Sequence, residues 1–171
     1  MTTTDDFSQL QDDFLRFTAK IVLCTVTTVS PEGRPRSRML HPVFTVRARS
    51  PVGWVCTSRT PVKARHLRLN PYVAVSYWSP DNDTVYAECR ATWVDSEGEK
   101  DDVWDLFTTT PPPLGYDLSG YGTPRNRHSA RCGSTPTGCR SSRAGSTRSV
   151  TWSDGSGGAV RETESAFAGG H

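Results

Sequence analysis

A series of short β-branched and aromatic segments, separated by turn-forming residues, constrains the fold more than any other feature of this sequence. Such segments favour β-strands, and they occupy residues 20–29, 34–46, 52–57, 72–78 and 84–94. Helix-type patterns or capping residues occur only at residues 5–18, 60–70 and 96–108. Because hairpin-linked strands with few helices are typical of antiparallel barrels, the sequence predicts a mostly β barrel with peripheral helices. Five strands do not easily close a barrel, so a sixth is expected.

The composition changes abruptly near residues 121–123. Residues 1–123 carry a net charge of −2, whereas residues 124–171 carry +4 and contain no Leu, Ile, Met or Lys. A segment with so few apolar residues cannot bury enough surface to offset the entropy of ordering. We therefore predict a folded domain over residues 1–123 and a disordered Arg/Ser/Gly-rich tail over residues 124–171. A nucleic-acid-binding arm is disfavoured, because the tail has a modest charge density and few aromatic residues.

The composition of the tail is also that of GC-rich DNA translated in the wrong frame. If each new codon begins at the third base of the old one, the codons of residues 125–139 permit Glu-Pro-Ala-Phe-Gly-Ala-Leu-Arg-Leu-Asp-Pro-Tyr-Arg-Val. This peptide has the character of a strand segment, and it would supply the sixth strand. We therefore expect an out-of-frame tail, with the last strand of the barrel missing or replaced by a disordered segment.

Several classes of protein are disfavoured by charge and hydropathy. The chain of 171 residues has a formal net charge of +2, which by itself implies no nucleic-acid partner. No apolar run approaches the roughly 18 residues of a membrane span, and the acidic N-terminus does not resemble a signal peptide, so a cytoplasmic protein is expected. Five cysteines without a CxxC motif favour buried thiols over a metal site. The four histidines are scattered, so neither a metal site nor a catalytic acid–base pair is predicted.

One group of basic and hydroxyl residues points to a ligand. Arg36 and Arg38 alternate on one face of a predicted strand, and another strand ends in Cys56-Thr57-Ser58 just before a helix that begins near Thr60. Lys63 lies in the first turn of that helix. Arginine, hydroxyls, a helix N-terminus and a lysine together suit a phosphate monoester. A solvated basic face is the alternative interpretation.

The residues that carry a family resemblance are Pro35-Arg36-Ser37-Arg38-Met39-Leu40-His41, Gly53-Trp54-Val55-Cys56-Thr57-Ser58, Pro61-Val62-Lys63-Ala64-Arg65-His66-Leu67 and Asn70-Pro71-Tyr72-Val73-Ala74-Val75-Ser76-Tyr77-Trp78. Over roughly residues 7–122 the chain resembles the pyridoxamine 5′-phosphate oxidase-like, FMN-binding split-barrel family. The resemblance implies a six-stranded antiparallel split barrel, a homodimer, and a flavin at the subunit interface.

The resemblance also implies roles for individual residues. Arg38 and Lys63 match the family's phosphate-binding residues, and Thr84 weakly matches a residue that contacts the flavin from the other subunit. The backbone of Met39, Leu40 and His41 would meet the edge of the isoalloxazine ring, while Cys56, Thr57 and Ser58 would lie at the ring and the phosphate. The family's Ser-Arg before the lysine reads Pro61-Val62 here, so Arg36 or Arg59 is expected to replace the missing arginine.

The expected function is that of an FMN-dependent oxidoreductase that exchanges a hydride at flavin N5 with a small-molecule substrate not yet identified. Three alternatives remain open. The first is a reductase that uses a deazaflavin coenzyme of the F-420 type, the second is a non-catalytic flavin- or haem-binding module, and the third is a damaged chain that binds no cofactor. Specific oxidation of vitamin B6 is disfavoured, because the substrate-binding residues of those oxidases usually lie near the C-terminus, where the tail stands here.

Overall fold

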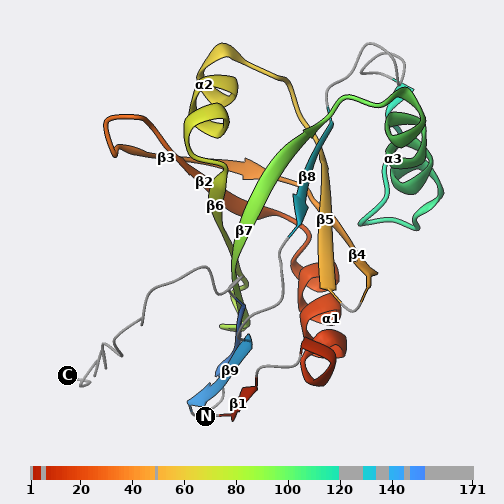
Figure 1. Cartoon of the computed structure of the whole chain (residues 1–171). Coiled ribbons are helices and arrows are strands. Elements are labelled where there is room, and N and C mark those ends of the chain that lie inside the picture. Colours follow the sequence, from red (N-terminus) through yellow and green to blue (C-terminus); the bar gives the residue numbers. More distant parts are fainter. Residues whose placement is uncertain are drawn as a thin grey trace.

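The computed structural model describes residues 2–4, 7–48, 50–119, 129–133, 139–144 and 147–152. Its helices are a 3-10 turn η1 (Phe7–Gln9), α1 (Gln11–Ile21), α2 (Pro61–Leu69) and α3 (Glu97–Thr109). Its strands are β1 (Thr2–Thr4), β2 (Cys24–Val29), β3 (Pro35–Leu40), β4 (Val43–Arg47), β5 (Ser50–Cys56), β6 (Tyr72–Trp78), β7 (Thr84–Val94), β8 (Ser129–Gly133), β9 (Cys139–Ala144) and β10 (Thr147–Trp152). The predicted mostly β fold with peripheral helices is confirmed (Figure 1).

The strands form an antiparallel split barrel. Hydrogen bonding runs in the order β3, β2, β6, β7, β8, β5 and β4, and all of these pairings are antiparallel. No pairing joins β3 to β4 among the described residues, so the hydrogen-bonded ring is not closed. The two ends of the sheet are instead consecutive in the chain, because β4 follows β3 after His41 and Pro42. The split leaves one edge of β3 without a neighbouring strand in the described part of the chain.

The split has a local cause in the sequence. The prediction of one continuous strand over residues 34–46 was wrong, since the structure divides it into β3 and β4 at His41 and Pro42. Proline has no backbone N–H and a fixed φ, so it interrupts a hydrogen-bonded ladder. Pro42 is buried, so the bend turns inward toward the barrel.

The sixth barrel position is filled by β8. Residues Ser129–Gly133 pair with β5 on one side and with the end of β7 on the other. The expectation of a missing strand is therefore corrected. A shortage of apolar residues prevents a segment from folding alone, but a strand added between two existing edges is held by backbone hydrogen bonds, which any residue except proline can supply. The predicted domain boundary at 123, like most of the predicted disordered tail, lies outside the described residues.

A second set of strands extends the sheet at the other half of β7. β10 pairs in parallel with Thr84–Ala87, β9 pairs with β10, and β1 pairs with β9. Thr4 therefore belongs to a strand and does not cap a helix, which corrects the predicted helix over residues 5–18. The chain instead makes the turn η1 and begins α1 at Gln11, because Phe7 and Leu10 are buried in the core.

Two helices cover the ends of the barrel, as Figure 1 shows for α1 and α2. Phe14 and Phe17 of α1 are almost completely buried against β6, β7 and Phe44 of β4. Leu67 of α2 packs against the same core from the other end. The third helix, α3, packs with Val103 and Phe107 on a separate cluster that includes Trp54. The sheet and α2 together position the candidate site.

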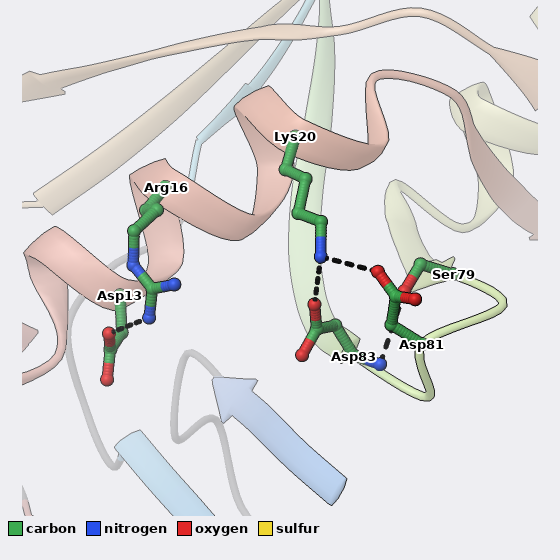
Figure 2. A network of polar contacts seen from close by, with 6 residues as sticks. All are labelled: Asp13, Arg16, Lys20, Ser79, Asp81 and Asp83. Carbon is green, nitrogen blue, oxygen red and sulfur yellow. Dashed lines mark hydrogen bonds and ion pairs between the residues drawn. The ribbon is translucent and has the colours of Figure 1, made fainter.

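Polar contacts join α1 to the loop between β6 and β7 (Figure 2). Lys20 Nζ donates to Asp81 Oδ2 and to Asp83 Oδ2, each at 2.8 Å. The backbone N–H of Asp83 donates to Ser79 Oγ at 3.3 Å, which holds the loop in shape. These contacts raise the pKa of Lys20 and lower that of Asp81. A carboxylate whose pKa is lowered by folding stabilises the folded state at any pH above the pKa that it has in the unfolded chain. The ion pair between Lys20 and Asp81 therefore loses its stabilising effect as the pH falls through the folded-state pKa of Asp81.

Candidate functional site

The candidate site begins on the inner face of β3. Arg36 lies opposite Thr28 and Arg38 lies opposite Val26 of β2, and both of these β2 residues face the barrel interior. The predicted alternation therefore places both guanidinium groups on the inner face, at the end covered by α2. Arg38 is half-buried and Arg36 is exposed.

Arg38 and Lys63 lie close enough to repel each other. Burial lowers the pKa of Lys63, and the charge of Arg38 lowers it further. Burial likewise lowers the pKa of Arg38, with a contribution from Arg36. Lys63 Nζ donates to Thr57 Oγ1, and Arg38 Nη1 donates to Thr28 Oγ1 at 3.0 Å. Within the described residues neither cation has an acidic partner, so the pair favours an anionic ligand.

These polar groups stand at one end of an apolar cavity inside the barrel. The cavity measures about 50 Å³, and Thr28, Arg38, Thr57 and Lys63 are among the residues that line it. Its remaining lining is apolar and comes from β2 to β7 and α2 (Val26, Leu40, Pro42, Phe44, Gly53, Val55, Leu67, Val73, Val75, Ala91 and Trp93). A space of this size holds a few water molecules and no ring system. A large ligand must therefore lie outside the barrel and reach the cations from the surface.

The edge of β3 offers backbone groups to such a ligand. Met39 lies on the outer face and is 60% exposed, whereas Leu40 lies on the inner face and lines the cavity. β3 pairs with β2 alone in the described part of the chain, so its second edge presents N–H and C=O groups without strand partners. Unpaired edge groups of this kind bind polar ligand edges well.

The end of β5 contributes the hydroxyl side of the site. Cys56 is the last residue of β5 and is half-buried, and Thr57 lies against Lys63. Ser58 is exposed just before α2. Thr60 precedes α2, with Pro61 in its first turn, so the first N–H groups of this helix have no intrahelical partner. The structure thus brings Thr57 and Lys63 together with Arg38, as the sequence predicted.

Two predicted site residues lie elsewhere in this chain. The ring of His41 packs on Tyr116 at 4.8 Å between centroids and near Phe107 at 6.3 Å, on the side covered by α3. Burial lowers the pKa of His41, and its Nε2 has no hydrogen-bond partner within the described residues. Thr84 is buried at the start of β7, opposite Trp78, three strands from β3. Thr84 does not line the cavity that Arg38 lines in the same chain.

The two candidates for the missing arginine differ in their surroundings. Arg59 Nη1 donates to Asp95 Oδ1 at 2.9 Å, and its guanidinium lies 5.1 Å from the centroid of Trp93. Arg36 has neither an acidic partner nor an aromatic one among the described residues, and its charge acts on Arg38. Arg36 is therefore better placed to serve the same ligand as Arg38.

Sequence reasoning missed two buried polar residues beside Arg38. Thr28 and His66 are 3% and 4% exposed, and Thr28 Oγ1 lies 2.9 Å from His66 Nδ1. His66 lies on α2 and Thr28 on β2, so 38 residues separate them in the sequence. The sequence does place His66 on the inner face of a short helix, which could have marked it as a buried polar residue. Nothing in the sequence indicates which strand residue would face it.

A metal site and a membrane-spanning helix are not found among the described residues. They contain no group of three or more His, Cys, Asp and Glu residues that could hold a metal ion. Cys24 and Cys89 are buried free thiols, and burial raises the pKa of Cys24 to about 12, which makes it unreactive at neutral pH. No helix in this part of the chain has the length and apolarity that a membrane crossing requires.

Comparison with protein families identifies one family that matches most of the chain. Residues 10–110 match the pyridoxamine 5′-phosphate oxidase family. No curated protein matches the chain at a significant level.

Solved structures share the fold at low sequence identity. A NimC/NimA family protein from Clostridium acetobutylicum has a TM-score of 0.59 at 12% identity and covers 80% of this chain and 87% of its own. A pyridoxamine 5′-phosphate oxidase-related, FMN-binding protein from Nostoc punctiforme has a TM-score of 0.52 at 12% identity, with 85% and 94% covered. General Stress Protein 26 from Bacillus anthracis gives 0.52 at 16%, with 72% and 88% covered.

Proposed function

Because this chain belongs to the pyridoxamine 5′-phosphate oxidase family, we propose that it binds FMN and acts as a flavin-dependent oxidoreductase on a small-molecule substrate. The observation that carries the proposal is the pair formed by Arg38 and Lys63, two partly buried cations without an acidic partner in the described residues. Like charges that repel each other are stabilised by an anion between them. A phosphate monoester supplies that anion.

The residues fit the phosphate end of FMN. Lys63 and Arg38 provide the charge, Thr57 and Ser58 provide hydroxyls, and the first turn of α2 provides free N–H groups. Arg36 adds a third positive charge at the surface. A substrate phosphate would satisfy the same groups, so the choice of FMN rests on the family.

The ring would lie outside the barrel, against the free edge of β3. The cavity of about 50 Å³ is too small for it, whereas the second edge of β3, which includes Met39 and Leu40, has no strand partner among the described residues. When bound, FMN supplies a two-electron centre that exchanges a hydride with a substrate. The N–H groups of this edge would donate to the ring and stabilise negative charge on it.

A homodimer would complete the site. Directly opposed residues share a face of the sheet, and one row across β3, β2, β6 and β7 reads Met39, Thr25, Ser76 and Tyr86. Trp78 of the same face is 62% exposed, and Met39 and Tyr86 are 60% and 45% exposed. The small residues Thr25 and Ser76 lie between large exposed side chains, and such a surface suits contact with a second copy of the chain. Thr84 would then meet the flavin of the partner subunit.

The absorbance spectrum of the purified protein tests the proposal. We expect flavin absorption bands that coelute with the protein after FMN is added and excess is removed. A shorter-wavelength band retained from the host, or gained on adding deazaflavin coenzyme, would assign the alternative cofactor. A second protein with the reading frame restored after Thr123 should be measured in parallel, because yellow colour only in that protein would mean that the present tail damages the site. If neither protein binds a flavin or deazaflavin, the proposal fails.

The affinity for FMN should begin to fall at a lower alkaline pH than it would if Lys63 had the pKa of an ordinary lysine. Burial and Arg38 lower the pKa of Lys63 from 10.5, so Lys63 loses its proton, and its attraction for phosphate, below that pH. Fluorescence titration of FMN between pH 7 and 10.5 would measure the decline. Riboflavin, which lacks the phosphate, is the control: it reports the effect of pH on the isoalloxazine ring itself, and the affinity for FMN should fall more steeply than the affinity for riboflavin. An FMN affinity that stays constant to pH 10.5 would contradict the assignment of Lys63.

Replacing Trp78 by Glu should dissociate the proposed dimer. A buried Trp anchor typically contributes about 2 kcal/mol or more, which corresponds to roughly 30-fold weaker association. Sedimentation velocity over a range of protein concentrations would measure the change. Leu69→Glu is the matched control, since Leu69 is 54% exposed on α2 and away from this face. A wild-type chain that sediments as a monomer would refute the dimer outright.

A further inference from the structure

We propose that His66 and Thr28 are positioning residues that orient the Arg38 guanidinium toward the phosphate group of the cofactor. This inference rests on the proposed function, because it concerns the same phosphate site. Its new content is a buried pair that contacts no ligand and acts only through Arg38.

The contacts form a chain from helix to strand to strand. His66 Nδ1 of α2 lies 2.9 Å from Thr28 Oγ1 of β2, and Thr28 Oγ1 lies 3.0 Å from Arg38 Nη1 of β3. The Thr28 and His66 side chains are buried, and Arg38 is half-buried at the edge of the cavity. The chain therefore begins in the core and ends at the candidate site.

Hydrogen-bond chemistry gives each member a fixed direction. A guanidinium only donates, so Thr28 Oγ1 accepts from Arg38. The hydroxyl has a single proton, and no other acceptor for it is seen among the described residues. Donation of that proton to His66 Nδ1 satisfies both groups, with Nδ1 as the acceptor. The hydroxyl lone pairs then point toward β3, where they receive the Arg38 N–H.

The consequence for Arg38 is a restricted orientation. Nothing acidic in the described part of the chain holds Arg38, so Thr28 is the group that fixes one corner of its guanidinium. With Nη1 held, the remaining N–H groups stay available as a fork for a phosphate. A guanidinium that is already oriented loses less side-chain entropy on binding, and affinity rises accordingly.

Thr28→Val removes the hydroxyl and keeps the shape of the side chain. We expect FMN to bind roughly tenfold more weakly, because one hydrogen bond to a charged group is lost. Riboflavin affinity should not change, since riboflavin has no phosphate for Arg38 to meet. Thr28→Ser keeps the hydroxyl and should bind FMN about as well as the wild type.

Two double variants separate positioning from a merely structural role. In Thr28→Val combined with Arg38→Met, FMN should bind no more weakly than in Arg38→Met alone, because Thr28 acts only through Arg38. In Thr28→Val combined with His66→Leu, both buried polar groups are gone, so thermal stability should recover toward the wild-type value. FMN affinity should remain about tenfold weaker in that variant.

The binding and stability measurements on these variants either support or refute the positioning role of Thr28 and His66. An FMN affinity that recovers together with stability in Thr28→Val/His66→Leu would mean that the pair only supports the fold, and the proposal would be wrong. Equal losses for FMN and riboflavin would have the same meaning. If the wild-type chain binds FMN and Thr28→Val binds it equally well, positioning fails while the proposed function stands. If the wild-type chain binds no FMN, both fail.

Discussion

Lys63→Met is expected to weaken FMN binding by roughly 10- to 150-fold, the effect of losing one hydrogen-bonded ion partner worth about 1.5–3 kcal/mol. Lys63 is partly buried beside Thr57 and Arg38, so water replaces its charge only incompletely after the substitution. Methionine retains the length of the apolar stem, which limits the loss to the charge and its hydrogen bonds. Isothermal titration with FMN and with riboflavin would measure the change, and only FMN should be affected.

Arg68→Met is the matched control for this prediction. Arg68 lies on the same helix, α2, but it is exposed and does not line the cavity with Lys63. The same change of residue type there should alter the affinity less than twofold. If Arg68→Met weakened FMN binding as much as Lys63→Met, general positive charge would explain the affinity, and the assigned phosphate site would be wrong.

The largest effect on stability is expected for Phe14→Ala. The ring of Phe14 is completely buried and meets Phe7 and Phe44 edge to face, at centroid distances of 5.6 and 5.0 Å. Truncation would leave a cavity where α1 covers the end of the barrel. Buried Phe→Ala changes lower the free energy of unfolding by about 3–5 kcal/mol, which is a large part of the stability of an ordinary domain. Urea unfolding followed by tryptophan fluorescence would measure it.

Leu69→Ala is the control for the stability measurement. Leu69 is 54% exposed at the end of α2, so its truncation should change the free energy of unfolding by less than about 0.5 kcal/mol. A loss below about 1 kcal/mol for Phe14→Ala would show that α1 does not pack on the barrel as described here.

The sequence was sufficient for two of the strands and for the cation pair. Strands β6 and β7 have the bounds that were predicted from their β-branched and aromatic residues, because alternate positions must face the core. Arg38 and Lys63 come from different elements, yet the residue pattern grouped both at a candidate phosphate site before the structure placed them at one cavity.

Long-range contacts explain what the sequence could not predict. The helix predicted over residues 5–18 begins later in the structure, because burial of Phe7 and Leu10 favours a turn before α1. His66 meets Thr28 only because α2 folds back over β2, and neither residue carries a local pattern that marks the pair. Pro42 did carry a local signal, the missing N–H, yet its effect on the ladder depends on the barrel around it.

The place of β8 in the sheet has a consequence for how the chain folds during synthesis. β5 and β7 leave the ribosome long before Ser129–Gly133, which pairs with both of them. Until then the nascent barrel carries two facing strand edges without their partner, and such edges attract chaperones and other chains. The sheet of the barrel is therefore completed only after Ser129–Gly133 has emerged, and the time that this takes sets how long the growing chain is exposed to misassembly.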